Sequence, residues 1–219
     1  IISTTTGLSM SSLIFYTDES QAVVATDTLA VDSNGEPFLL TSKSAHIPHL
    51  NLIITGTGCG GFANEWAMHV NNRMILSGIM NLDYHTQNSL LELWNKYKED
   101  LSLPESMTTT VYHFGISEES KNIVSFAYRS TNEFRSEAIQ YGTAVKPECT
   151  LLEGNLIEII PLMMQEQREI QESQPRESRI YIGGEIYVMH LTEQGCNTFK
   201  IGEFPDFKKH QQLTLLKNS

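Results

Sequence analysis

Short apolar runs rich in β-branched residues open the chain, and turn-forming residues separate them. Two such runs joined by a short polar segment are typical of a β-hairpin. The first predicted hairpin joins Leu13–Tyr16 to Gln21–Thr26. The second joins Leu29–Val31 to Pro37–Leu40 through a segment of Asp, Ser, Asn and Gly. A further buried strand is predicted at Leu50–Thr55.

Helical periodicity begins after the glycine-rich segment Gly56–Gly61. From Phe62 onward, apolar residues recur every three or four positions, which predicts a first helix. The same spacing predicts a second helix over Thr86–Asp100 and a third over Leu156–Glu172. Pro161 lies inside the third range, so that helix is expected either to begin at this proline or to kink there.

Strand-like segments fill most of the remaining chain. Three of them are predicted between the second and third helices, at Thr108–Ile116, Asn122–Tyr128 and Phe134–Tyr141. After the third helix, Ile180–Leu191 contains a glycine pair that indicates a bulge or a close approach of another backbone, and Asn197–Gly202 completes a final hairpin. Because runs of strands alternate with runs of helices, without strict βαβ order, the pattern predicts a layered α+β fold.

The size and the charge of the chain limit the classes of function. The chain has 219 residues and shows no internal repeat or linker, which favours one domain. Its formal net charge of −11 argues against a nucleic-acid partner, because phosphate binding requires clustered Lys and Arg. No apolar run reaches the roughly 18 residues that a membrane span needs. We therefore expect neither a nucleic-acid partner nor a membrane.

The cysteines suggest a reducing compartment. Cys59, Cys149 and Cys196 are odd in number, and no Cys or His pair has the spacing of a zinc site. We therefore expect buried thiols and no metal. Ile1–Ser9 has neither a basic residue nor a long apolar core, so it does not resemble a secretion signal. These features together predict a cytoplasmic location.

Three polar residues stand at regular spacing in the first part of the chain. Asp27 follows Ser11 by 16 positions, and Lys43 follows Asp27 by 16. They lie in the opening hairpin, SSLIFY…QAVVATDTLA, and at the start of KSAHIPHLNLIITGTGCGGFANEW, which contains a strand and a glycine-rich turn. Over roughly residues 11–70 the chain resembles proteasome β-subunits and bacterial proteasome-like proteases, which are N-terminal-nucleophile (Ntn) hydrolases. The resemblance implies a four-layer αββα sandwich.

The resemblance also implies a catalytic set for cleaving peptide or other amide bonds. Ser11 would be the nucleophile and its own α-amino group the base, since a serine hydroxyl needs activation. An α-amine with a pKa of ~7.7–8 suits proton transfer near neutrality. Lys43, paired with Asp27, would ease ionisation of the hydroxyl. A backbone N–H of Gly58 or Gly60 would bind the oxyanion, and no cofactor is implied.

This chemistry requires a free amine at Ser11, which the preceding residues block. Residues 1–10 are therefore expected to be an N-terminal extension or a propeptide. Alternatively, Met10 is a native initiator that is removed before Ser11, with the earlier residues added upstream. Residues 11–205 form the predicted single domain, and residues 206–219 form a polar C-terminal tail.

Two other functions stay open. A non-catalytic proteasome-fold subunit would retain the N-terminal extension and act through assembly. A small-molecule-binding domain would use the glycine-rich turn. The proteases also place a supporting serine in a Gly-Ser-Gly segment after the central strands, where this chain has Lys146–Cys149. Since members of the family commonly form rings, the resemblance implies a homo-oligomer.

Overall fold

The computed structural model describes residues 12–217 as a mixed structure of helices and antiparallel sheets. Helices and strands occur in separate runs along this part of the chain, so the predicted α+β class is confirmed. Two short 3-10 helices, Pro48–Leu50 and Ser130–Asn132, connect strands. The α-helices within the described residues are α1 (Phe62–Arg73), α2 (Ile79–Leu101), α3 (Leu156–Glu172) and α4 (Phe207–Lys217).

The strands form two large sheets and one small one. The first sheet has the order β10-β1-β2-β11-β12, the second has the order β5-β6-β7-β8-β9, and β3 pairs only with β4. The strands are β1 (Leu13–Thr17), β2 (Gln21–Asp27), β3 (Leu29–Val31), β4 (Pro37–Leu40), β5 (Ser44–Ile47), β6 (Leu52–Gly58), β7 (Thr109–Ile116), β8 (Ile123–Arg129), β9 (Ser136–Ala138), β10 (Gly142–Lys146), β11 (Glu185–Thr192) and β12 (Gly195–Glu203).

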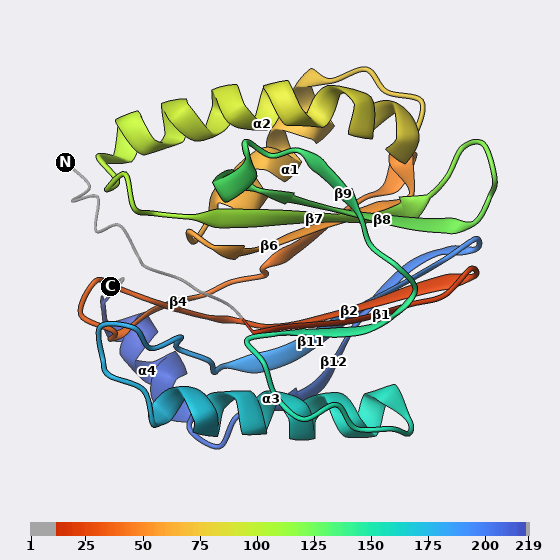
Figure 1. Cartoon of the computed structure of the whole chain (residues 1–219). Coiled ribbons are helices and arrows are strands. Elements are labelled where there is room, and N and C mark those ends of the chain that lie inside the picture. The colour runs from red at the N-terminus through yellow and green to blue at the C-terminus, as the bar shows by residue number, and fades with distance from the viewer. Residues whose placement is uncertain (1–11, 218–219) are drawn as a thin grey trace.

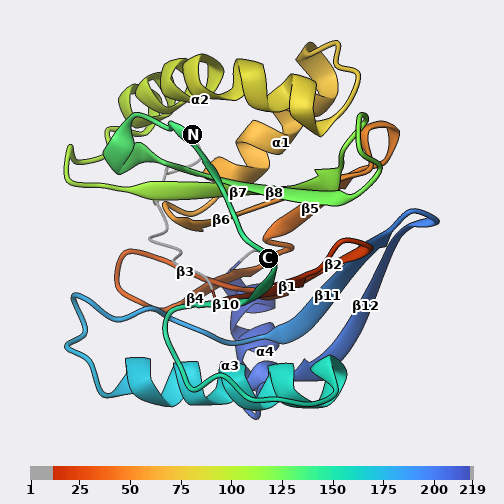
Figure 2. The same cartoon turned by 45° about the vertical axis from the view of Figure 1, so that its right-hand side comes forward.

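The two large sheets are stacked face to face (Figure 1). Helices α1 and α2 lie over the outer face of the second sheet, and α3 and α4 lie on the outer side of the first. The view turned by 45° shows the same order (Figure 2). Side chains on β1 alternate between these layers, because successive residues of a strand point to opposite faces. Leu13 and Phe15 join the core between the sheets, whereas Ile14 packs on the side of α3.

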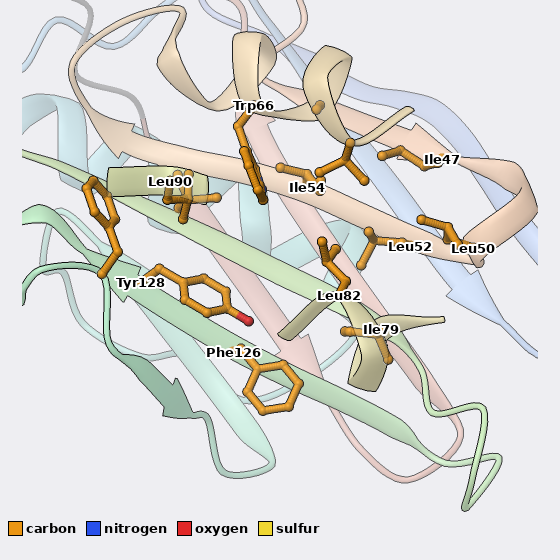
Figure 3. Close-up of a cluster of buried hydrophobic side chains, with 14 of the residues drawn as sticks. Ile47, Leu50, Leu52, Ile54, Trp66, Ile79, Leu82, Leu90, Phe126 and Tyr128 are labelled. Atoms are coloured by element: carbon orange, nitrogen blue, oxygen red, sulfur yellow. The ribbon is translucent and has the colours of Figure 1, made fainter. Parts of the chain in front are cut away.

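A second core fills the space between α1, α2 and the second sheet. Trp66 comes from α1, and Leu82 and Leu90 come from α2. They pack with Ile54 and Tyr128 of the second sheet (Figure 3). All five side chains are almost inaccessible to solvent. Burying them supplies much of the free energy that holds the helices on the sheet, at about 1.5–3 kcal/mol for each large apolar side chain.

Several of the predicted elements are confirmed. Both opening hairpins are present, as β1–β2 and β3–β4. The helix predicted from Phe62 is α1, and the helix predicted over Leu156–Glu172 is α3. The option that α3 begins at Pro161 is wrong, because the helix starts at Leu156. The Asn155 side chain caps that start by accepting a hydrogen bond from the backbone N–H of Ile157.

Other predictions need correction. Helix α2 begins at Ile79 and not at Thr86, and β5 was not predicted. The expected polar tail folds largely into α4, which lies against β4. An ion pair fixes the start of this helix, since Arg168 of α3 and Asp206 make two hydrogen bonds of 2.8 and 2.7 Å.

Candidate functional site

A buried ion pair connects the first sheet to the start of the second. Asp27 ends β2 and is 0% exposed, and Lys43 directly precedes β5 and is 7% exposed. The Lys43 Nζ lies 2.8 Å from the Asp27 Oδ1. The structure therefore brings together two of the three predicted catalytic side chains. The third, Ser11, lies outside the described residues.

The Asp27 carboxylate also binds two backbone amides. Its Oδ1 accepts a hydrogen bond from the Ser12 N–H, and its Oδ2 accepts one from the Gly183 N–H, both at 3.0 Å. Strand β2 lies between β1 and β11, and both neighbours are antiparallel to it. The end of β2 therefore meets the start of β1 and the approach to β11. This topology explains how residues far apart in the sequence donate to one carboxylate.

Burial shifts the pKa values of both members of the pair. It raises the pKa of Asp27 and lowers the pKa of Lys43, because each charge loses hydration. The opposite charge and the hydrogen bonds to Asp27 offset part of this effect. Removing only one partner would leave an uncompensated buried charge.

A cavity of about 270 Å³ lies beside Lys43. Its wall is mostly apolar and comes from the β3–β4 hairpin, the glycine-rich turn and the start of α1. Lys43 and Gly60 are also part of the wall. Concave apolar sites with a few convergent polar groups are typical of ligand-binding sites. The apolar lining residues are Ala30, Val31, Phe38, Leu39, Cys59 and Ala63.

The glycine-rich turn forms one edge of this cavity. Gly58 has a φ of +92°, and a Cβ there would lie 2.4 Å from the Thr108 carbonyl oxygen, so only glycine fits. The N–H of Cys59 donates to the same carbonyl at 3.0 Å and is therefore already engaged. Gly60 borders the cavity, and its carbonyl accepts a hydrogen bond from the Tyr97 hydroxyl at 3.1 Å. Of the two predicted oxyanion donors, only Gly60 thus shares the cavity wall with Lys43.

The glycine pair predicted to allow a close backbone approach does so. The Gly183 carbonyl accepts hydrogen bonds from the N–H groups of Thr28 and Leu29, at 3.3 and 3.1 Å. A Cβ on Gly184 would lie 2.4 Å from the Thr28 hydroxyl. The segment before β11 therefore packs directly against the residues after Asp27. This contact holds the Gly183 N–H in place to donate to the Asp27 carboxylate.

One buried side chain next to the site was missed by the sequence patterns. Gln167 of α3 is 0% exposed, and its Oε1 accepts a hydrogen bond of 2.5 Å from the Ser12 hydroxyl. Its Nε2 donates to the Pro147 carbonyl. A polar residue within an apolar helical stripe is the signal that could have revealed it. The same face of α3 carries the buried residues Ile160, Met163 and Met164.

Comparisons with protein-family models and with characterised proteins find no match to the chain. Among residues 12–217, no group of three or more His, Cys, Asp or Glu side chains is placed to hold a metal ion. In the same range, no helix combines the length and the apolar character needed to cross a membrane. The candidate site is therefore defined by its own geometry: the buried pair, the Ser12 amide, the glycine-rich turn and the cavity.

Proposed function

We propose that the chain is a proteasome-like Ntn hydrolase that cleaves peptide or other amide bonds, and that its layers form the four-layer αββα sandwich of this class. The observation that carries the proposal is the buried Asp27–Lys43 pair, which is hydrogen-bonded to the backbone nitrogen of Ser12. That nitrogen belongs to the peptide bond with Ser11. The buried charges are therefore anchored within one residue of the proposed nucleophile.

In the proposed reaction, residues 1–10 are first removed, which gives Ser11 a free α-amine. The Ser11 hydroxyl attacks the substrate carbonyl carbon while the α-amine takes its proton and passes it to the leaving amine. Water then hydrolyses the acyl ester and restores the enzyme. Lys43, held by Asp27, lowers the cost of ionising the hydroxyl. The N–H of Gly60, which shares the cavity wall with Lys43, stabilises the oxyanion, and the scheme uses no cofactor.

The cavity beside Lys43 supports a preference for apolar substrates. Its volume of about 270 Å³ and its lining by Val31, Phe38 and Ala63 suit a side chain such as Leu, Met or Phe next to the scissile bond. The further parts of the proposal, a ring-forming homo-oligomer and a cytoplasmic location, rest on the resemblance and on the composition.

The first test compares the chain that begins at Ser11 with the chain that keeps residues 1–10. The shorter chain can be released from an N-terminal fusion by a protease that cuts directly before Ser11. We expect it to hydrolyse fluorogenic peptide amides that carry Leu, Met or Phe at the scissile bond. We also expect one acyl group per chain, by intact mass, after treatment with an electrophilic acylating probe. The longer chain should do neither, because an amide nitrogen is not a base.

The second test removes the buried charge. Lys43→Ala should lower turnover by on the order of 100-fold or more, since it removes the field beside the nucleophile. Lys96→Ala, which changes an exposed lysine on α2, is the matched control. Lys43→Ala also leaves Asp27 unpaired, which by itself destabilises the fold. The double variant Asp27→Asn/Lys43→Met removes both charges. Melting temperatures of both variants show whether the fold is kept. A folded chain that begins at Ser11 but shows neither turnover nor adduct would reject the hydrolase and favour the non-catalytic subunit.

A further inference from the structure

The buried amide of Gln167 has only one orientation that satisfies its partners. The Pro147 carbonyl can only accept a hydrogen bond, so the Nε2 of Gln167 must face it and donate. Its Oε1 then faces Ser12, whose hydroxyl must act as the donor. The direction of both hydrogen bonds, and the rotamer of Ser12, are thereby fixed. We call this arrangement the Ser12–Gln167–Pro147 bridge.

Ser12 is held from two sides by different elements. Its N–H donates to Asp27 at the end of β2, and its hydroxyl donates to Gln167 of α3. Ser12 itself is 0% exposed. The Ser12 nitrogen belongs to the planar peptide unit that also contains the carbonyl of Ser11. The two hydrogen bonds therefore hold in place the residue that directly follows the proposed nucleophile in the sequence.

Filling space does not account for a glutamine at this position. Its neighbours on the same face of α3 include the buried residues Met163 and Met164. A methionine at position 167 would occupy similar volume without the cost of removing an amide from water. What the glutamine adds is the pair of directed hydrogen bonds to Ser12 and Pro147.

We propose that Gln167 is a positioning residue for the N-terminal nucleophile, acting through Ser12. It does not touch the reacting atoms, and the inference rests on the proposed function. The bridge limits rotation at the start of β1, so that the reacting hydroxyl and amine keep one geometry. Displacing such groups by about 1 Å can cost on the order of 100-fold in rate.

The test measures kcat and KM for variants of the chain that begins at Ser11. Gln167→Met removes both hydrogen bonds while keeping volume, and Ser12→Ala removes one of them. We expect each to lower kcat about 10- to 100-fold with KM changed less than threefold. Gln165→Met makes the same chemical change on the same helix and breaks only a hydrogen bond to Glu169. That control should keep kcat within twofold.

A double-mutant cycle separates positioning from stability. If the bridge acts as a unit, Ser12→Ala in the Gln167→Met background should lower kcat no further. Gln167→Met with lower stability but kcat within twofold of the parent would overturn the proposal. If Gln167→Met does not fold, Ser12→Ala alone decides, with the same criterion. Failure of the proposed function looks different, because the parent chain and every variant would then lack both turnover and acyl adduct, and the positioning role would fall with it.

Discussion

At the scale of single residues, His113 is a fully buried titratable group outside the candidate site. It is 0% exposed, and its Nε2 accepts a hydrogen bond of 2.8 Å from the Trp66 indole N–H. Because the indole nitrogen can only donate, the imidazole must be neutral with its proton on Nδ1. Burial lowers the pKa of His113 to about 3 from an ordinary value of 6.5. Folding therefore favours the neutral imidazole over the imidazolium.

This requirement predicts that acid destabilises the protein through His113. Below pH 6.5 the unfolded chain binds the proton while the folded chain does not, until the pH nears 3. The contribution of neutral His113 to the free energy of unfolding is fully present above pH 6.5. Below that pH it falls by about 1.4 kcal/mol per pH unit. The test measures urea unfolding at pH 7, 6 and 5 for the parent chain and for His113→Gln, which keeps an acceptor for Trp66. Between pH 7 and pH 5 the unfolding free energy of the variant should fall by about 2 kcal/mol less than that of the parent.

The matched control for this prediction is His85→Gln, which changes an exposed histidine on α2. It should leave the acid dependence of the unfolding free energy as in the parent chain. An unchanged dependence in His113→Gln would contradict the buried neutral histidine.

Only those residues of the candidate site that belong to a short sequence motif could be predicted. Asp27 and Lys43 were predicted from the resemblance to proteasome-like proteases, whose spacing they match, and the structure places them in contact. Gln167 lies 155 positions from Ser12, so no local pattern connects the two. The same holds for Gly183, which was predicted to allow a close approach, without any sign that its N–H would bind Asp27. Long-range hydrogen bonds to backbone atoms leave no such local pattern.

At the scale of elements, the start of α2 shows why a boundary was misplaced. The helix begins at Ile79 after Gly78, whose position offers no side-chain cap. The cap comes from Glu118, in the turn between β7 and β8, whose carboxylate accepts from the N–H groups of Met80 and Asn81 at 3.0 and 2.8 Å. A Cβ on Gly78 would lie 2.5 Å from that carboxylate, so the glycine allows its approach. Because the capping residue is far away in the sequence, the first two turns of the helix were not predicted.

We expect Glu118→Ala to destabilise the fold by about 1 kcal/mol at neutral pH, because two N–H groups lose their acceptor and the helix dipole loses its anion. The unfolding free energy in urea measures the loss. Glu119→Ala removes the same charge from the neighbouring exposed position and should change the free energy much less. Equal losses of unfolding free energy in the two variants would mean that the negative charge stabilises the fold and that the hydrogen-bonded cap does not.

The remaining errors at this scale have similar causes. Strand β5 is short, polar at one end and followed by a proline, so it lacks a clear alternating pattern. Helix α4 is stabilised by contacts with β4 and by the Arg168–Asp206 ion pair more than by an apolar stripe of its own. Elements with a strong period of their own, such as α1 and the opening hairpins, were predictable for the opposite reason.

At the scale of the whole molecule, the candidate site depends on the stacking of the two sheets. Asp27 belongs to the first sheet, whereas Lys43 directly precedes the first strand of the second. The core between the sheets holds Leu13 and Phe15 against Phe114. Since the ion pair spans this junction, a shift of one sheet against the other would separate its charges. The apolar packing between the two sheets therefore keeps the polar groups of the candidate site in contact.

The outer helical layers lead to the last prediction, that the chain assembles into a homo-oligomer. Met68 of α1 and Leu162 of α3 are 59% and 61% exposed, and contacts between helical layers of neighbouring subunits would cover them. Light scattering coupled to size-exclusion chromatography should give a mass several times 24.7 kDa. Met68→Glu and Leu162→Glu should lower that mass, because assembly would bury a charge. Ile75→Glu, in the loop between α1 and α2, should not. A mass of 24.7 kDa at all concentrations would contradict assembly and leave the proposed chemistry to be tested on a monomer.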